Sequence, residues 1–434
     1  MPVDSSEDRP LQLTDPDVLA CPYGYYAQLH EHGAAARDEG PIGWAIAGHP
    51  DVWELSRDTR RFSAELFGPE GTKLLGMNPD PPPSPEVMAL VAKMRPMANA
   101  LVIGDPPAHG RQKAIANKWL NGAHVKGMEP LIREVVDRTI DGWIDDGHCE
   151  FVSQFAIPVP LILIAHALGV DDADLARFKV WTDHLEMGYM EPLNNEQRLR
   201  VAASVLEFQD YIVEQIADRT AYPTDDLLSA LVNARLVGDE AELDEQQESG
   251  PDRLSEAEIL TMTSQLLAAG NVTTTSLIAD VMVALLQNPQ AMADVRADPA
   301  LIGAAIEESL RRDAPIRCGW RVTKEDVELD DVTVPAGSVA FLAYGAANHD
   351  PSLFPEPATY DIHRANLNRH VGFGHGPHFC VGSHLARAEA RIAFEHLLSR
   401  LDDIRIPDGT PPDPIICLAL HGFREVHLTF SPAS

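Results

Sequence analysis

The sequence predicts a mainly α-helical protein with a minor β region, and long helix-periodic segments carry this expectation. Residues 256–287 form a run that is apolar around most of its circumference in the middle, which is typical of a buried central helix. Ser255 and Glu258 form a capping box that opens it, and Pro289 lies just past its end. Residues 109–235 hold several further helical segments. Helices therefore dominate the chain.

Short strands are expected at both ends of the chain. Residues 44–47 have a strand pattern and precede a helix that begins near Pro50. Residues 316–345 are interpreted as strands around a Pro-Ala-Gly turn, and further strands are expected near 415–430. A last helix is expected at about 380–401. The minor sheet is thus built largely from the C-terminal half.

Length and charge limit the classes of function. The chain has 434 residues and a formal charge of −32, from 34 Lys and Arg against 66 Asp and Glu. So strong an acidic excess argues against nucleic acid or an anionic membrane as a partner. We expect a flexible N-terminal segment at residues 1–20 and a single domain over residues 21–434.

Cysteine usage and the absence of apolar runs point to a reducing compartment. The chain has 5 cysteines, widely scattered and without a CxxC pair, which is neither a disulfide framework nor a zinc site. The polar, acidic N-terminus does not resemble a signal peptide, and no run approaches the roughly 18 apolar residues of a membrane span. A cytoplasmic protein without membrane insertion is predicted.

Two segments allow a simple structural interpretation beside a sharper one. Residues 64–108 hold Met77, Met88, Met94 and Met97 among many prolines. They are either an irregular surface loop with one short helix near 85–94, or a mobile lid whose methionines adapt to an apolar ligand. The acidic stretch 238–252 is interpreted as a solvated connector.

The segment FGHGPHFCVG, residues 373–382, carries the strongest chemical signal. Glycines surround Cys380, and a helix follows at once. Glycines let the backbone approach something flat and bulky, and a helix N-terminus would lower the pKa of a thiol. Cys380 is therefore a candidate metal ligand, with a buried structural cysteine as the alternative.

This segment resembles the haem-binding loop of the cytochrome P450 family, with its pattern FxxGxxxCxG matched by Phe373, Gly376, Cys380 and Gly382. Three further family elements occur in order: the ExxR pair of Glu308 and Arg311, the NHDP stretch at 348–351 followed by Arg364, and DPPAH at 105–109. The resemblance, to the soluble bacterial type, implies the P450 fold, a triangular helix-rich prism with haem between the long central helix and the cysteine-loop helix.

The resemblance also implies a cofactor site for haem b. Cys380 would be the axial thiolate and Phe373 would pack beside it. The residues expected to bind the propionates are His109, Lys113, Arg321 and His378. Lys113 departs from the arginine common in the family, so it either binds a propionate or faces a redox partner. Glu308, Arg311 and Arg364 would form a buried structural network, where the alternative is an exposed ion pair.

The stretch LLAAGNVTTT, residues 266–275, matches the family's AGxxT element at Ala269, Gly270, Asn271 and Thr273. The resemblance implies that Gly270 admits dioxygen where the helix widens, and that the Thr273 hydroxyl relays protons to the reacting oxygen. The alternative, bonds back to carbonyls four residues earlier, is assigned to Thr274 and Thr275 but not to Thr273.

Valine at position 272 departs from the family, which usually has an acid before the threonine. Three explanations stay open. Asn271 with ordered water replaces the acid, the substrate supplies a hydroxyl, or oxygen reduction is poorly coupled to product.

By resemblance, electrons come from NAD(P)H through a ferredoxin reductase and an acidic ferredoxin. A docking patch is expected at Arg111, Lys113, Lys118, Arg387 and Arg391, with a solvated charged face as the alternative. The predicted protein is a monomer.

The predicted activity is hydroxylation or epoxidation of an apolar molecule, such as a terpenoid, steroid or fatty acyl compound. The alternatives are a peroxide-driven or atypical haem-thiolate enzyme and a non-catalytic haem sensor. Candidate pocket residues are 77–102, 185–190, Leu266, Ala269, Ile316 and Arg317. Arg317 either faces an anionic substrate group or, as the simpler interpretation, the surface or a propionate.

Overall fold

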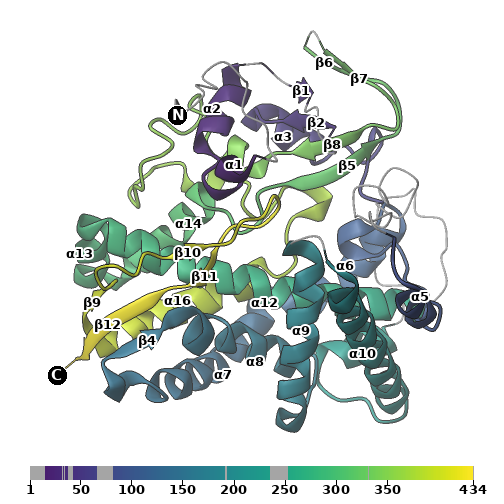
Figure 1. Ribbon diagram of the computed structural model, residues 1–434, viewed down its shortest axis with the longest axis horizontal. Helices are drawn as coiled ribbons and strands as arrows, with labels where there is room; N and C mark the ends of the chain where they lie inside the picture. The colour runs from purple at the N-terminus through teal and green to yellow at the C-terminus, as the bar shows by residue number, and fades with distance from the viewer. Residues whose placement is uncertain are drawn as a thin grey trace, which may run out of the picture.

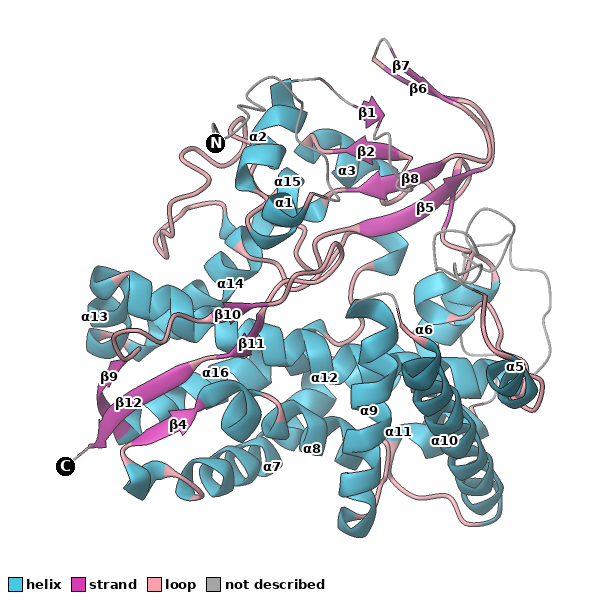
Figure 2. Ribbon diagram, viewed as in Figure 1, coloured by secondary structure: helices cyan, strands magenta, loops and turns pink. Residues whose placement is uncertain are grey.

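The computed structural model describes residues 15–31, 33, 35–37, 43–65, 82–190, 193–234, 253–330 and 332–433. Within these ranges helices make up most of the molecule, while the strands lie near the N-terminal helices and near the C-terminus (Figure 1, Figure 2). The prediction of a mainly α protein with a minor β region is confirmed.

The helices surround one long central member, α12 (Figure 1). Their bounds are α1 (Pro16–Ala20), α2 (Tyr23–Glu31), α3 (His49–Leu55), α5 (Pro85–Val91), α6 (Ala108–Leu120), α7 (Gly122–Asp141), α8 (Pro158–Ala167), α9 (Leu175–Met190), α10 (Asn195–Ala221), α11 (Leu227–Asn233), α12 (Glu256–Gln287), α13 (Pro289–Ala297), α14 (Ile302–Arg312), α15 (Tyr344–Ala347) and α16 (Ser383–Arg400). Helices α8, α9, α14 and α16 pack against α12.

The strands form small sheets at the edges of the helical body. Their bounds are β1 (Ala35–Arg37), β2 (Trp44–Ile46), β3 (Phe62–Ser63), β4 (His148–Glu150), β5 (Gly319–Thr323), β6 (Val327–Leu329), β7 (Val332–Val334), β8 (Val339–Leu342), β9 (Leu401–Arg405), β10 (Asp413–Pro414), β11 (Phe423–Glu425) and β12 (His427–Pro432). The largest described sheet has the order β1-β2-β8-β5-β3, with β2 and β8 parallel and its other pairs antiparallel. A second sheet has the order β4-β12-β9.

Helix α12 begins and ends where the sequence predicts. Ser255 Oγ accepts the Glu258 N–H at 3.2 Å, and Glu258 Oε2 accepts the Ser255 N–H at 2.8 Å, which completes the capping box. Among the described residues it is the helix long and apolar enough to cross a membrane, but 72% of its most apolar stretch is buried inside the protein. Packing around most of its circumference accounts for that composition.

The sequence predicted a loose segment over residues 1–20, but the described part of it is ordered as a helix. Residues 1–14 lie outside the described residues. Residues 16–20, by contrast, form α1, where Val18 is buried and the Leu19 carbonyl accepts a hydrogen bond from Arg317 Nη1 at 2.8 Å. Pro16 presets the helical backbone angle, and the buried valine anchors the turn. The expectation is therefore wrong for this part.

Part of the proline- and methionine-rich segment is well defined. The expected short helix is present as α5, which packs on α10. After it, the Arg95 N–H donates to Gln209 Oε1 at 2.8 Å and the Ala98 N–H donates to Thr261 Oγ1 at 3.0 Å. These bonds attach residues 95–98 to α10 and α12. Met77 and the acidic stretch 238–252 lie outside the described residues, so the lid stays a prediction.

Candidate functional site

The loop at residues 373–382 has a backbone that only glycine adopts easily. Gly374 and Gly376 have φ values of 69° and 71°, in the left-handed region. A Cβ on Gly376 would lie 2.8 Å from Arg57 Cγ, because α3 ends against the loop. The sequence of the loop therefore permits both the turn and the close approach that bring Cys380 to the start of α16.

Two contacts hold this loop around the cysteine. The Cys380 N–H donates to the Phe373 carbonyl at 2.9 Å. From α6, Lys113 Nζ donates to the carbonyls of Pro377 and Phe379, the second at 2.7 Å. Lys113 thus makes a contact that the sequence analysis did not anticipate, and its binding to a propionate or a redox partner stays a prediction. Its flexible stem lets the ammonium brace the cysteine loop.

The Cys380 thiol lies deep in the protein and keeps an accessible surface. Burial raises its pKa, and the backbone N–H groups of Gly382 and Ser383 oppose that rise only in part. Lys113 and Arg387 act in the same lowering direction. The expectation of a lowered thiol pKa is therefore wrong, because desolvation outweighs the helix N-terminus. A thiol in this position ionises when a cation stands beside the sulfur, as a metal ion does.

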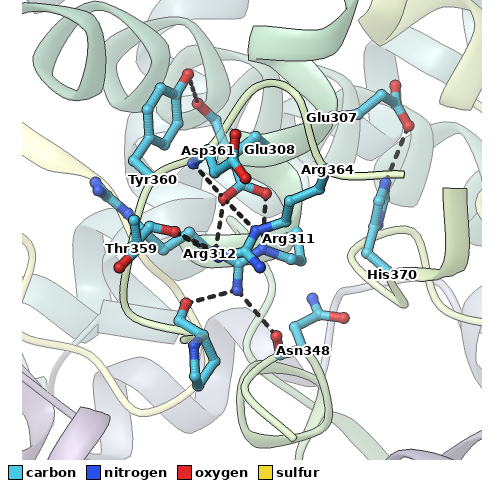
Figure 3. A network of polar contacts seen from close by, with 12 residues as sticks. Glu307, Glu308, Arg311, Arg312, Asn348, Thr359, Tyr360, Asp361, Arg364 and His370 are labelled. Carbon is cyan, nitrogen blue, oxygen red and sulfur yellow. Dashed lines mark hydrogen bonds and ion pairs between the residues drawn. The ribbon is translucent and has the colours of Figure 1, made fainter. Parts of the chain in front are cut away.

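Beneath the loop, Glu308 and Arg311 on α14 form a fully buried ion pair (Figure 3). Arg311 donates from Nε and Nη2 to the two carboxylate oxygens at 2.7 and 2.8 Å, and both side chains are 0% exposed. Arg364 Nε donates to the same carboxylate at 3.1 Å. The structure thus brings the three predicted network residues together.

The remaining donors of Arg311 reach the segment that leads to the cysteine loop. Nη1 donates to the carbonyls of Asn348 at 3.1 Å and Pro357 at 2.7 Å, and Nη2 donates to Thr359 at 3.2 Å. Asn348 Oδ1 in turn accepts the Val371 N–H at 2.7 Å. All five N–H donors of the guanidinium are therefore used, and the network supports the loop from below.

On the α6 and β5 side of the loop, two neutral histidines, His109 and His378, lie beside the cation Arg321. The rings of His109 and His378 lie 4.1 Å apart, and Arg321 projects from β5. Burial lowers the pKa of His109 to about 4 and that of His378 to about 2, and Arg321 acts in the same direction. Among the described residues, His378 Nε2 and Arg321 Nη2 are buried without a hydrogen-bond partner. Buried donors in this state indicate an anionic ligand.

One face of α12 is accessible in the middle of an otherwise buried helix. Ala269 is exposed, and Val272 and Thr273 are half-buried, whereas most of the helix is buried. Positions three and four apart share a helix face, so these residues front one accessible space. This is the face on which the sequence placed the AGxxT element.

The hydroxyl groups of this element differ from the expectation. Thr273 Oγ1 donates to the Ala269 carbonyl at 2.7 Å, the back-bond that we did not expect there. Thr275 Oγ1 donates to the Ala156 carbonyl at 3.0 Å, outside its own helix. Which carbonyl a threonine reaches depends on whether a neighbouring segment offers one, and only the packing of residues 152–156 on α12 decides that.

Gly270 has a packing role that the sequence analysis did not anticipate, and dioxygen access there stays a prediction. A Cβ there would lie 3.0 Å from Ile164 Cγ1, so the glycine allows α8 to pack closely on α12. The helix is α-helical throughout its length, without the expected widening. Asn271 beside it is buried. Val272 instead packs against an apolar cluster of Ile415, Cys417 and Leu420.

The cations of the expected redox-partner patch are largely committed to partners within the chain. Arg111 pairs with the buried Glu258. Arg387 donates from Nε and Nη2 to Glu307 at 2.6 and 2.8 Å. Arg391 pairs with Glu129 and Glu395, both at 2.7 Å, and Lys113 braces the loop. Lys118 is exposed and lies two turns after Arg111 on the same face of α6. The patch is therefore weaker in net charge than its residue types suggest.

Some functional neighbours had no signal in the sequence. Burial raises the pKa of Glu307, but hydrogen bonds and charges from Arg387 and His370 outweigh burial and lower this pKa to about 2. Glu307 Oε2 lies 3.0 Å from His370 Nε2. Arg317 is buried, which excludes the surface-facing interpretation, and its Nη1 donates to the carbonyls of Leu19 and Cys417 at 2.8 and 3.0 Å. Contacts this distant in sequence follow no periodicity.

Comparisons with known proteins agree with these motifs. The family model described as Cytochrome P450 matches residues 186–421. Cytochrome P450 107B1 of Saccharopolyspora erythraea is 34% identical over 418 residues, which cover 92% of this chain and 93% of that protein.

Solved structures are similar over nearly the whole chain. Cytochrome P450 CYP109Q5 from Chondromyces apiculatus has a TM-score of 0.81 and 31% identity, covering 98% of this chain and 99% of that one. The myxobacterial CYP267B1 in complex with myristic acid has a TM-score of 0.80 and 32% identity, covering 96% and 98%.

Proposed function

Because the chain belongs to the cytochrome P450 family and is a haem-binding monooxygenase, we propose that it hydroxylates or epoxidises an apolar small molecule, with electrons from a ferredoxin. The observation that carries the proposal is one loop that holds both the Cys380 thiol and a buried ring nitrogen without a partner, His378 Nε2, with Arg321 beside His378 and its Nη2 likewise unpartnered among the described residues. The relative crystallised with myristic acid supports the apolar substrate class.

The residues present fit haem b. The Cys380 thiol would ligate the iron, and His378 Nε2 and Arg321 Nη2 would donate to propionates, with His109 beside them. Bound haem with a thiolate ligand would supply the activation of dioxygen. The protein contributes the loop braced by Lys113 and supported by the Glu308 network.

On α12, Thr273 is the proposed proton-relay residue. Its hydroxyl hydrogen is engaged by the Ala269 carbonyl, so its oxygen lone pairs are available to accept a hydrogen bond from water or substrate. Val272 lies in an apolar cluster and offers no proton. We propose that protons arrive through ordered water near Asn271 or through a substrate hydroxyl.

A substitution at position 272 tests this relay. Val272→Glu is expected to raise the product formed per NAD(P)H consumed, because an acid would stand next to Thr273. Val272→Gln is the matched control, with the same length but no acid, and is expected to leave the ratio unchanged. An equal ratio in parent and Val272→Glu would contradict the idea that proton supply is limiting.

The ferredoxin is proposed to dock where α6 and α16 meet the cysteine loop. Arg387→Glu is expected to slow reduction of the protein by ferredoxin in stopped-flow measurements. Glu307→Gln, which frees Arg387 from its partner, is the counterpart and is expected to keep or raise the rate. Rates unchanged in both variants would reject this docking site. A reducing cytoplasm is proposed as its compartment, since all five cysteines are free.

The apolar surroundings of Val272 favour one alternative, a peroxide-driven haem-thiolate enzyme. Turnover with peroxide compared with turnover with NAD(P)H, reductase and ferredoxin separates the two. A screen of fatty acids, steroids and terpenoids for the haem spin-state shift would identify the substrate class. If only peroxide supports turnover of a compound that gives this shift, the ferredoxin-dependent function is wrong.

A further inference from the structure

A short segment between β10 and β11 is tied down at several points. We call residues 415–422 the strap. Its main chain pairs with residues 315–317: the His421 N–H donates to the Pro315 carbonyl at 2.9 Å, and the Arg317 N–H donates to the Ala419 carbonyl at 2.8 Å. The strap also closes on itself, with the Ile415 N–H donating to the Gly422 carbonyl at 2.9 Å. It is therefore held as one piece.

The strap lies directly on the accessible stretch of α12. Its apolar side chains Ile415, Cys417 and Leu420 form the cluster against which Val272 packs. One turn further along α12, a Cβ on Gly422 would lie 2.4 Å from Ser276 Oγ, so the strap backbone touches the helix there. The strap thus covers α12 immediately beside Thr273.

One side chain of the strap reaches into a buried charged site. His421 lies between Asp280 on α12 and Asp313 at the end of α14, with Nδ1 to Asp280 Oδ1 at 3.2 Å and Nε2 to Asp313 Oδ1 at 3.9 Å. The Asp280 side chain is 1% exposed. Neither carboxylate oxygen of Asp280 has a well-aligned hydrogen bond among the described residues. His421 is therefore the side chain whose positive charge compensates the buried carboxylate.

The second carboxylate of this site is anchored from other elements. Arg312 Nε donates to Asp313 Oδ2 at 2.6 Å, and the Tyr23 hydroxyl of α2 donates to Asp313. These contacts hold Asp313 in place without the strap. Asp280, by contrast, depends on His421 alone for an opposite charge within ion-pair distance in the described part of the chain. An uncompensated buried carboxylate is costly, so this contact couples α12 to the strap.

We propose that Asp280 and His421 are positioning residues that hold the strap against α12 and so limit the size of the substrate group that fits beside Thr273. The inference rests on the proposed monooxygenase function and adds a specificity determinant to it. The chain of contacts is Asp280 to His421, His421 to the strap backbone, and strap side chains to Val272.

The same contacts make the position of the strap depend on pH. Burial lowers the pKa of His421, but Asp280 and Asp313 raise it more, while Arg317 acts against them. Burial raises the pKa of Asp280, and His421 opposes that rise. A histidine with a raised folded pKa contributes stability at low pH that is lost as the pH rises through that pKa. The strap is therefore held most firmly where Asp280 is ionised and His421 is protonated, and it loosens as the pH rises through the pKa of His421.

Two neutral ligands of different bulk test the proposal on the ferrous holoprotein. The measured quantity is the Kd of tert-butyl isocyanide divided by that of methyl isocyanide. Asp280→Asn is expected to lower this ratio by about fivefold, because a loosened strap admits the bulky ligand. In the parent the ratio is expected to fall as the pH rises through the raised pKa of His421, and in His421→Gln it is expected to stay flat.

A second measurement does not depend on haem ligands. Hydrogen exchange of the strap amides, His421 and Ile415 among them, is expected to quicken in Asp280→Asn and not in the control Asp226→Asn. Asp226 is a buried carboxylate that pairs with Arg219 away from the strap. His421→Gln serves in place of Asp280→Asn if that variant does not fold.

The outcomes separate the two claims. An unchanged ligand ratio and unchanged exchange in both variants, in a parent with a normal thiolate carbon monoxide spectrum, would overturn the positioning role. A parent that lacks the thiolate spectrum would overturn the proposed function instead, and the exchange measurement would still decide whether Asp280 holds the strap.

Discussion

Two buried arginines on either side of the cysteine loop differ in one respect. Arg311 is 0% exposed, and all five of its N–H donors have acceptors within the chain. Arg321 is 6% exposed; its Nη1 donates to the Trp320 carbonyl, but its Nη2 has no partner among the described residues. A guanidinium whose donors are all used inside the chain serves the fold. One that is buried with a donor unused is prepared for a ligand.

The histidines near the loop follow the same division. His370 contacts Glu307, which also binds Arg387, so its site is complete without a ligand. His109 and His378 face each other and the cation Arg321. Their pKa values are lowered by burial first and by neighbouring cations second, so an anion bound beside them would raise both values.

The largest expected effect concerns Arg311, whose donors all have acceptors within the chain. Glu308→Gln leaves Arg311 and Arg364 buried without their carboxylate, and we expect a loss of about 3–5 kcal/mol in the free energy of unfolding. Urea unfolding measures it. The exposed pair of Arg60 and Glu325 provides the control, since Arg60→Ala is expected to cost less than about 0.5 kcal/mol. Similar losses in both variants would remove the distinction.

Arg321 is expected to show the opposite pattern, with a small effect on stability and a larger one on haem affinity. Arg321→Gln removes a buried charge whose Nη2 has no acceptor among the described residues, so the apoprotein should lose little or no stability. Haem affinity should fall by about tenfold or more, the size of a lost charge-assisted hydrogen bond. Transfer of haem to an acceptor protein measures the affinity, and urea unfolding of the apoprotein measures the stability. Strong destabilisation of the apoprotein with unchanged haem affinity would show that Arg321 serves the fold.

The pH dependence of stability should separate the apoprotein from the holoprotein. His109 has a folded pKa of about 4, lowered by burial first and then by Lys113 and Arg321. A histidine with a depressed pKa binds fewer protons folded than unfolded, so stability falls as the pH drops from its ordinary value of about 6.5 towards 4. Propionates beside it would raise that pKa, so the holoprotein should lose less. Thermal unfolding of both forms between these pH values is the measurement. His109→Gln is expected to reduce the difference, and His378, whose pKa burial also lowers, accounts for the remainder.

The smallest loss of stability is expected at Arg387, which has a partner within the chain but is partly exposed to water. Arg387 is bound to Glu307 but about a third exposed, so water screens the pair. Arg387→Gln should cost about 1 kcal/mol or less in urea unfolding, since the fork geometry is good but the site is not sealed. A loss as large as that of Glu308→Gln would place Arg387 in the supporting network of the loop.

Much of the site could be predicted because its signals are local. The capping box, the run of apolar residues and the terminal proline predicted α12 at its observed bounds. The spacing of Glu308 and Arg311 places both on one helix face, whatever the rest of the chain does. The glycines of the cysteine loop were expected to allow a close approach of the backbone, and the structure adds that Gly374 and Gly376 have left-handed φ values.

What could not be predicted depends on which segment packs where. Gly270 was assigned to dioxygen access, yet its missing side chain makes room for Ile164 of α8. Thr273 and Thr275 have the same chemistry, and the carbonyls that they reach differ because one faces its own helix and the other faces Ala156. Lys113 and Arg317 were expected near ligands, but both donate to backbone carbonyls of distant segments.

The sequence by itself determined the fold class, the thiolate loop and the ion pair of α14, because each follows from backbone preference or from spacing along one element. Only the tertiary structure decided which buried charges are complete. Arg311 and Arg321 are the same residue type, as are Asp280 and Asp313, so the sequence alone does not distinguish their roles. Whether a buried charge serves the fold, awaits a ligand or positions the strap depends on the acceptors that other elements bring to it, and burial makes that difference large in free energy.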